Sequence, residues 1–256
     1  MDFRKTFDCI PGQFDRWRPR YCPELFSEVI RYAGIGPQKS VLEIGPGTGQ
    51  ATEPFLKTGC RYEAIELGEH FAAFMRERFS RYAGFHLVEG DFETHDFGEQ
   101  AFDLVFSAAT IQWIPEEIAF PKVFSLLRPG GTLAMFMTRT DEKTPNGPLY
   151  DAIQKVYDEH FHVKTRYTCK MDYRRAVCYG FEDFHYQDWR KTRIYSAQEY
   201  ADYLAATQVE HITLEEPCRS RFFEGVKNAV TAAGDRIVLE DTIALYLARK
   251  PQTADK

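Results

Sequence analysis

One short stretch of the sequence combines an acid with an unusual density of glycine. Val41 to Thr52 reads VLEIGPGTGQAT: an apolar run carries a single acid, Glu43, and then breaks into Gly45, Gly47 and Gly49. Glycine lets the backbone turn with positive φ and lets a ligand approach without meeting a Cβ. Between a strand and a helix, such a loop turns backbone N–H groups toward an anionic group. The stretch therefore predicts a loop that binds a pyrophosphate or a carboxylate.

The spacing of the glycines differs from the dinucleotide-binding fingerprint. That fingerprint is G-x-G-x-x-G, whereas the spacing here is G-x-G-x-G, with Pro46 inside it and Gln50 at the place of the third glycine. Three glycines are also more than a plain tight turn requires. A nicotinamide-dependent oxidoreductase is therefore the less favoured alternative.

The segment V-L-E-I-G-P-G-T-G closely resembles the first motif of class I S-adenosylmethionine-dependent methyltransferases, in particular small-molecule, methyltransferase type 11-like members. In that family an acid precedes the first glycine on the same strand, as Glu43 does here. The resemblance implies that S-adenosyl-L-methionine is the cofactor and S-adenosyl-L-homocysteine the product. It also implies that Glu43 and the backbone of Gly45, Gly47 and Gly49 hold the amine and carboxylate of the cofactor's methionine part.

Two further acids stand where this resemblance requires them. Glu66, followed by Leu67, lies 21 residues after Gly45 and is expected to accept hydrogen bonds from the ribose hydroxyls. Asp91 in VEGDFE is expected to bind the adenine amine, with the ring of Phe92 packed on the base. The alternatives are an ordinary solvated acid for Glu66 and a helix or turn cap for Asp91.

The segment FDLVFSAATIQWIP resembles the fourth motif of the family, which lines the methyl-transfer site in many members. The resemblance implies that Ser107 and Ala108 lie against the sulfonium and that Gln112 and Trp113 line the substrate pocket. Related small-molecule enzymes often have His-Trp where this chain has Gln-Trp, so no general base is transferred to Gln112. For Trp113 the alternatives are a plain core residue or an aromatic wall for a cation or a flat substrate.

Two other segments match the family. F-D-R-W-R-P-R-Y-C-P, from Phe14 to Pro23, resembles a flap over the cofactor, in which Arg18 would pair with the cofactor carboxylate and Tyr21 would be a further contact. The alternative for Arg18 is a surface arginine. LLRPGG, which ends at Gly131, is expected to stop a helix and turn the chain.

Alternating strand and helix signals position these residues. Short apolar runs predict strands at 41–44, 62–65, 85–88, 102–106 and 132–137, with helices at 50–58, from 68 onward and at 116–128. Pro121 is expected to kink the last of these helices. Later signals are a helix at 149–161, a strand at 184–195, a capping box at Ser196, a helix at 219–233 and a strand at 243–248. Such alternation indicates βαβ units and a parallel sheet with its binding crevice at the carboxyl ends of the strands.

The expected fold class is α/β. The resemblance implies a Rossmann-like, doubly wound, mostly parallel seven-stranded sheet with helices on both faces, an antiparallel last strand and a cap insertion. We expect an N-terminal flap and helix at 1–36, a cofactor-binding core at 37–138, an insertion that shapes the acceptor pocket at 139–200, and a C-terminal helix and strand at 201–256.

Composition narrows the function classes. The chain has 256 residues with 44% hydrophobic content, a net charge of −6 and a pI of about 5.7, so partners such as nucleic acid or an anionic membrane are disfavoured. No run approaches the ~18 apolar residues of a membrane span, and the N-terminus lacks the apolar core of a signal peptide. The six cysteines show no C-x-x-C pair. We therefore expect a cytoplasmic protein with reduced thiols.

The chemistry leaves the acceptor open. Methyl transfer from a sulfonium is a direct displacement, and a base is required only if the acceptor must lose a proton. Weak candidates for a catalytic base are Tyr21, His185, His211 and Tyr195, and no metal site is expected. Cations in the insertion could bind an acidic group or form a solvated basic face: Lys164, Arg166, Lys170, Arg174 and Arg175.

The predicted function is methyl transfer to a small-molecule acceptor. The alternatives are a non-catalytic S-adenosylmethionine-binding protein, the oxidoreductase and a nucleic-acid methyltransferase. The sequence does not decide the atom that is methylated or the oligomeric state.

Overall fold

The computed structural model describes residues 3–164 and 171–252. The chain divides into two compact units, each discontinuous in sequence. The sheet unit comprises Arg20–Met137, Cys169–Asp188 and Ala244–Lys256, and the helical unit comprises Met1–Pro19, Thr138–Thr168 and Trp189–Ile243.

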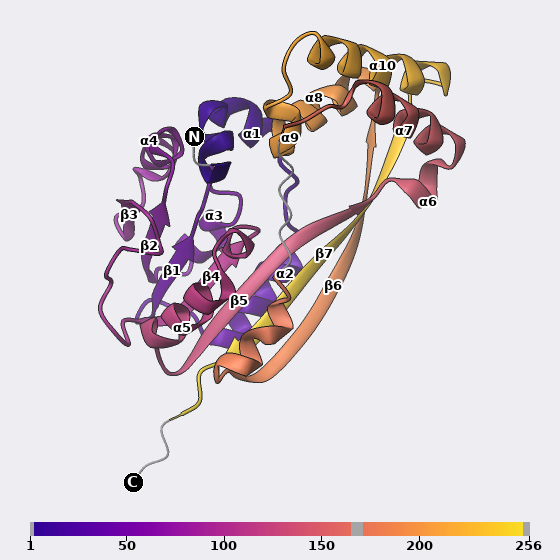
Figure 1. The fold of residues 1–256 in the computed structure, drawn as a ribbon. Helices are drawn as coiled ribbons and strands as arrows, with labels where there is room; N and C mark the ends of the chain where they lie inside the picture. Colours follow the sequence, from indigo (N-terminus) through magenta and orange to yellow (C-terminus); the bar gives the residue numbers. More distant parts are fainter. Residues whose placement is uncertain (1–2, 165–170, 253–256) are drawn as a thin grey trace. The chain divides into compact units, whose positions relative to one another are not determined.

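Seven strands form one sheet in the order β3-β2-β1-β4-β5-β7-β6 (Figure 1). The strands are β1 (Ser40–Ile44), β2 (Arg61–Glu66), β3 (Phe85–Glu89), β4 (Phe102–Ala108), β5 (Leu127–Asp141), β6 (Glu182–Tyr195) and β7 (Ile237–Arg249). The first five pair in parallel, with β1 between β2 and β4. All five residues of β1 are buried, which explains why the strand is apolar apart from Ser40 and Glu43.

The last strands are antiparallel, as predicted. Backbone hydrogen bonds join Gly130 and Gly131, near the start of β5, to Lys250, directly after the end of β7. Asp183, near the start of β6, pairs with Arg249 at the end of β7. The strand order and directions confirm the predicted seven-stranded, mostly parallel Rossmann-like sheet.

The sheet unit contains several helices, the first of which begins at a proline and is followed by a glycine. They are α2 (Pro23–Ala33), α3 (Thr52–Leu56), α4 (Glu69–Phe79), η2 (Ile111–Trp113), α5 (Glu116–Leu126) and η3 (Tyr173–Tyr179). Pro23 starts α2, where a missing N–H costs nothing, and Gly34 ends it in the left-handed conformation. The core beneath these helices is rich in aromatic rings: Phe106 stacks on Phe136 at 5.8 Å.

The helical unit has its own apolar core. Its helices are η1 (Phe3–Cys9), α1 (Pro11–Trp17), α6 (Lys143–Asn146), α7 (Pro148–His160), α8 (Ala197–Thr207), α9 (Val209–Ile212) and α10 (Cys218–Ala232). Ser196 and Glu199 form the predicted capping box at the start of α8. Tyr200, Phe222 and Val226 are fully buried between these helices and the strand segments of the unit.

Several predicted elements differ from the structure in detail. The helix predicted at 50–58 is only α3, five residues long, because Gly59 turns the chain with φ of 76°. Pro121 lies inside α5 without ending it. The final strand, predicted at 243–248, extends over the whole of β7.

LLRPGG does not end α5 with a separate turn. α5 ends at Leu126, and β5 begins at Leu127 with the remaining residues already in the strand. The register moves from Phe102 opposite Leu127 to Leu104 opposite Thr132, so the segment forms a bulge of three extra residues. Gly130 permits it with φ of 75°.

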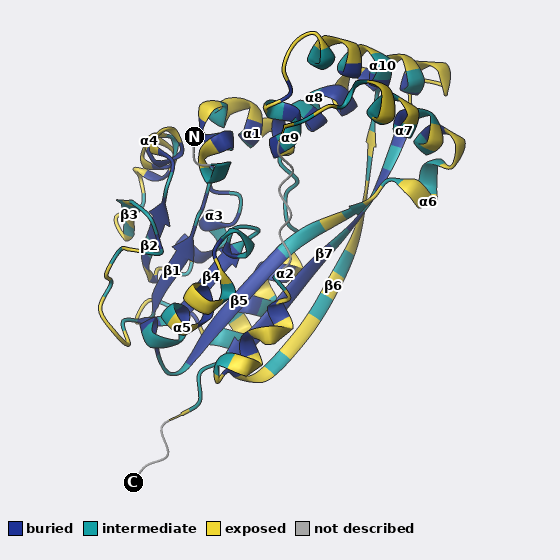
Figure 2. Cartoon of the chain, in the orientation of Figure 1, coloured by how far each residue is buried: buried dark blue, intermediate teal, exposed yellow. Residues whose placement is uncertain are grey.

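The region predicted as an insertion at 139–200 is not all peripheral. It contains α6, α7 and η3, but also β6, which is the seventh strand of the sheet. β6 stands at the end of the strand order and is half-buried or exposed along its length (Figure 2). No helix of the described residues is long and apolar enough to cross a membrane.

Candidate functional site

The carboxyl ends of four parallel strands bring the predicted cofactor residues to one edge of the sheet. Ile44 lies opposite Ile65 and Glu66 lies opposite Glu89, so the glycine loop, Glu66 and the segment around Asp91 follow neighbouring strands. β4 ends at this same edge and leads into η2. This is the place where open α/β sheets bind ligands.

The three glycines of the loop all have positive φ, of 63°, 59° and 86° at Gly45, Gly47 and Gly49. Two of them are also required by the packing of the protein itself. A Cβ on Gly45 would lie 2.3 Å from Cγ2 of Thr110, and a Cβ on Gly49 would lie 2.4 Å from the ring of Phe79. The loop therefore owes part of its glycine content to close approach by neighbouring side chains.

Glu66 ties the glycine loop to the end of β2. Its carboxylate accepts hydrogen bonds from the backbone N–H groups of Gly47 and Gly68, each at 2.9 Å. A carboxylate has about four acceptor positions, so these bonds are compatible with hydroxyl donors as well. Leu67 beside it is half-buried. Glu66 is itself buried, which does not fit the alternative of a solvated acid.

Glu43 is the most deeply buried acid of the site. Its side chain has 0% exposure, and its Oε2 accepts hydrogen bonds from the hydroxyls of Thr52, at 2.6 Å, and Tyr62. Its Oε1 receives no hydrogen bond from any described residue, and we call this atom the open oxygen. Burial, with a smaller contribution from the nearby charge of Glu66, raises the pKa of Glu43 to about 7 against the opposing effect of the two hydroxyls.

Asp91 and Phe92 are both engaged within the protein. Asp91 Oδ1 accepts from the backbone N–H of Glu93 at 3.0 Å, so its carboxylate caps the turn that follows β3. The ring of Phe92 is buried, with the ammonium of Lys122 5.2 Å from its centre. The turn-cap alternative for Asp91 is thus observed, and its contact with adenine stays a prediction.

The segment after β4 is held against the glycine loop. Ser107 is fully buried; its hydroxyl donates to the carbonyl of Ile44 at 3.3 Å and accepts from the N–H of Ile111 at 2.8 Å. The hydroxyl of Thr110 donates to the carbonyl of Gly45 at 2.9 Å. Ala108, at the end of β4, is half-buried. These bonds set the position of the loop from which a substrate would be contacted.

Gln112 and Trp113 lie in η2 and are half-buried. The side-chain amide oxygen of Gln112 accepts a hydrogen bond from the hydroxyl of Tyr173 at 2.6 Å. This bond gives Gln112 a structural partner on η3. The predicted roles of both residues in an acceptor pocket stay predictions.

Of the candidate bases and flap residues, two lie in the sheet unit. Tyr21 packs edge-on against Phe136, 4.9 Å between ring centres. His185 stacks on Tyr32, whose carbonyl accepts from Arg249. That group lies where β7 ends and β5 begins, at the edge of the sheet opposite the glycine loop.

Arg18, His211 and Tyr195 belong to the helical unit. The guanidinium of Arg18 lies 5.3 Å from the ring centre of Phe14. His211 is buried, and its Nε2 pairs with the hydroxyl of Tyr157 at 2.7 Å. Burial lowers the pKa of His211 to about 3, so its ring is neutral at physiological pH.

Some predicted charges have partners on the protein. Lys164 pairs with Glu215, and Arg175 pairs with Glu116. Arg174 is exposed, and Arg166 and Lys170 lie outside the described residues. Within residues 3–164 and 171–252, no group of three or more His, Cys, Asp or Glu side chains could hold a metal ion.

Comparison with known proteins finds a family match within the sheet unit. Residues 42–135 match the model of a family described as a methyltransferase domain. The structure resembles phosphoethanolamine N-methyltransferase 2 of Haemonchus contortus, solved with phosphomonomethylethanolamine and S-adenosylhomocysteine, with a TM-score of 0.60 and 16% identity over 98% of this chain and 61% of that one. Residues 42–135 form a methyltransferase domain.

Curated relatives share this methyltransferase domain over part of their length. Ribosomal RNA small subunit methyltransferase A of Marinobacter nauticus is 29% identical over 111 residues, 43% of this chain and 40% of that protein. An uncharacterized methyltransferase of Mycobacterium tuberculosis is 26% identical over 142 residues, 56% of each chain. The matches thus span about half or less of the length of these relatives. The predicted resemblance to class I methyltransferases is confirmed.

Two residues of the methyltransferase domain that matter for the site were not predicted. Thr52 and Tyr62 are the donors to Glu43, and they come from α3 and β2. Tyr62 sits in the same strand as Glu66, four residues earlier, on a face that alternation assigns to the core. A hydroxyl on the buried face of the strand that ends at Glu66 is the signal that could have identified it.

Proposed function

We propose that this chain is an S-adenosylmethionine-dependent methyltransferase that acts on a small-molecule acceptor. One observation carries the proposal: a methyltransferase domain holds, beside its glycine loop, a buried acid with an open oxygen. Leaving a buried polar atom without a partner costs about 1–3 kcal/mol, and more for a charged group. The ammonium of the cofactor's methionine part is a donor that would satisfy it.

The residues at the carboxyl edge fit the parts of the cofactor. Glu43 would bind the ammonium and the loop backbone the methionine carboxylate, while Glu66, already fixed by two N–H groups, would accept from the ribose hydroxyls. Asp91 would bind the adenine amine. The cofactor supplies an activated methyl group when bound, and the protein would contribute proximity and in-line orientation of the acceptor.

A small acceptor agrees better with the charge of the chain than RNA does. The net charge is −6, whereas binding to nucleic acid is driven by neutralising phosphates with Lys and Arg. The similarity to ribosomal RNA methyltransferases extends over less than half of this chain. Transfer of a labelled methyl group to a nuclease-treated metabolite extract, but not to purified RNA, is the expected result.

The test of the cofactor is calorimetric titration with S-adenosylmethionine, S-adenosylhomocysteine and NADH. We expect micromolar binding of the two sulfur compounds, which Glu66→Ala abolishes, and none of NADH. A wild-type protein that is folded but binds neither sulfur compound would contradict the proposal. Equal binding by Glu66→Ala would remove Glu66 from the site.

A non-catalytic binding protein is the second candidate. It is favoured by Gln112, which replaces the histidine frequent in related enzymes and whose side-chain amide oxygen is already engaged by Tyr173. Formation of S-adenosylhomocysteine with any acceptor would rule this candidate out. Tight cofactor binding without turnover across a broad acceptor panel would favour it.

A further inference from the structure

Glu43 is held through only one of its two carboxylate oxygens. Both hydroxyl donors, Thr52 and Tyr62, converge on Oε2, so the carboxylate is fixed in place while Oε1 remains the open oxygen. The donors come from the two elements next in sequence after the loop, α3 and β2. The geometry leaves one atom of Glu43 to respond to a ligand.

The surroundings of Glu43 oppose its ionisation in the absence of a ligand. Its neighbours on β1 and across β4 are apolar, and Phe106 lies opposite it in register. The charged group that acts on it is Glu66, of the same sign. Tyr62 keeps its own proton, because burial holds the pKa of Tyr62 well above its usual range.

We propose that binding of the cofactor expels a proton from Glu43, and that Thr52 and Tyr62 are positioning residues that set this coupling. In the free protein the proton sits on the open oxygen, because Oε2 already accepts two hydroxyls. The ammonium of the ligand donates to the open oxygen, the carboxylic acid becomes a carboxylate, and the proton passes to solvent. This inference rests on the proposed function, since the ammonium belongs to the methionine part of the cofactor.

The coupling predicts how affinity changes with pH. With the pKa of free Glu43 at about 7, and a lower value in the complex, lowering the pH from about 7.5 to about 5.5 should weaken binding roughly 25-fold. Roughly one proton should be released per ligand at the lower pH and about a quarter of a proton at the higher pH. An acid that is already ionised in the free protein would give neither effect.

The test is calorimetric titration of the whole chain with S-adenosylhomocysteine at several pH values, in two buffers that differ in ionisation enthalpy. The difference between the buffers gives the number of protons released. 5′-Methylthioadenosine is the matched ligand control, because it lacks the amine and the carboxylate of the methionine part. Its affinity should not change with pH and its binding should release no proton.

The variant Tyr62→Phe tests whether Tyr62 affects the protonation of Glu43 or only supports the fold. Loss of a hydroxyl that favours the carboxylate should move the midpoint of the affinity–pH curve upward by about one unit. Affinity then falls near neutral pH and recovers in more alkaline solution, whereas a purely structural defect would weaken binding equally at every pH. Tyr82→Phe is the control, because its hydroxyl bonds to Glu53 outside the glycine loop.

If Tyr62→Phe does not fold, the variant Glu43→Gln provides the same test. It mimics the protonated acid, so binding should be weak at every pH and release no proton. S-Adenosylhomocysteine bound by the wild type with the same affinity at all pH values and no proton release would overturn the inference while leaving the proposed function intact. No binding at any pH by the folded protein would overturn the proposed function and the inference with it.

Discussion

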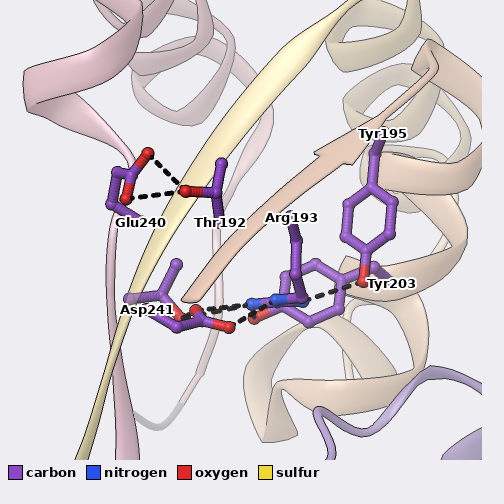
Figure 3. Close-up of polar contacts among 7 residues, drawn as sticks. Thr192, Arg193, Tyr195, Tyr203, Glu240 and Asp241 are labelled. Carbon is purple, nitrogen blue, oxygen red and sulfur yellow. Dashed lines mark hydrogen bonds and ion pairs between the residues drawn. The ribbon is translucent and has the colours of Figure 1, made fainter. Parts of the chain in front are cut away.

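Glu43 in the sheet unit and Asp241 in the helical unit are both almost completely buried, yet their partners differ. Asp241 accepts two hydrogen bonds from the guanidinium of Arg193, at 2.6 and 2.9 Å, and one from Thr140 at 2.7 Å. Arg193 also donates to Tyr195 and lies 4.7 Å from the ring centre of Tyr203 (Figure 3). Glu43 has two hydroxyls on one oxygen, and the other is open.

The difference separates an acid that holds a fold together from one that, in our proposal, binds a ligand. The Asp241 carboxylate uses both oxygens, and its charge is matched by the guanidinium of Arg193, whose side chain is 9% exposed. Burial opposes the charge of Arg193, but the interactions with Asp241 and Tyr203 together outweigh it and the pKa of Arg193 is raised. Glu43 has neither a cation nor a donor for its second oxygen among the described residues. Both acids are buried, so burial does not distinguish them. They differ in whether both carboxylate oxygens have donors within the described part of the chain.

The largest expected effect on stability comes from breaking the ion pair of Arg193 and Asp241. Arg193→Met leaves Asp241 as an uncompensated buried charge and should lower the free energy of unfolding by about 3–5 kcal/mol, measured by urea denaturation. The double variant Arg193→Met/Asp241→Leu should recover most of that loss, because both charges are gone. A single variant as stable as the wild type would mean that the pair contributes no more than an exposed ion pair.

Replacing Glu43 with an uncharged residue should instead remove a pH dependence of the unfolding free energy. The folded-state pKa of Glu43 is raised to about 7 from its ordinary value of 4.5, so its contribution to stability is fully present below pH 4.5 and is lost as the pH rises through 7. Relative to Glu43→Gln, the ligand-free wild type should lose about 3 kcal/mol of unfolding free energy across this window. Parallel stability–pH curves for the two proteins would contradict the raised pKa.

The glycine loop is predicted to be sensitive for structural as well as ligand reasons. Gly45→Ala places a Cβ against Thr110 at a φ of 63° and should cost about 2 kcal/mol of unfolding free energy. Thr110→Ser removes the methyl group that the new Cβ would meet first, so the double variant should regain part of the loss. Additive effects of the two substitutions would show that they do not contact each other.

The smallest effect is expected at an exposed pair of the helical unit. Lys164 and Glu215 are 82% and 70% exposed, and such pairs contribute little because water and salt screen them. Lys164→Ala should leave the unfolding midpoint unchanged. A clear shift of that midpoint would mean that the exposure of an ion pair does not predict how much the pair contributes to stability.

The sheet unit was largely predictable from the sequence. Most of its strands were predicted from short, largely apolar runs, and the position of Glu43 before the glycine loop led to its predicted role in cofactor binding. The donors to Glu43 were not predictable in the same way, because Thr52 and Tyr62 lie 9 and 19 residues away and meet only once β1, α3 and β2 have packed. The contact of Gly49 with Phe79 is of the same kind.

The helical unit gave weaker signals because distant pairs hold it together. Arg193 and Asp241 are 48 residues apart, and Tyr157 and His211 are 54 apart. Within residues 139–200 the strand predicted at 184–195 is present as β6, but its place at the end of the sheet was not predicted, because that region was interpreted as an insertion. The capping box at Ser196, by contrast, was predictable because its four residues are adjacent.

The central claim is that Glu43 carries a proton in the free protein and loses it to admit an ammonium group. The most direct measurement is infrared difference spectroscopy on adding S-adenosylhomocysteine at about pH 6, with Glu43→Gln as the reference. The wild type should lose the carbonyl-stretch band of a protonated carboxylic acid, and the variant should show no such change. Ligand binding without loss of that band would show that Glu43 is ionised from the start and would contradict the account.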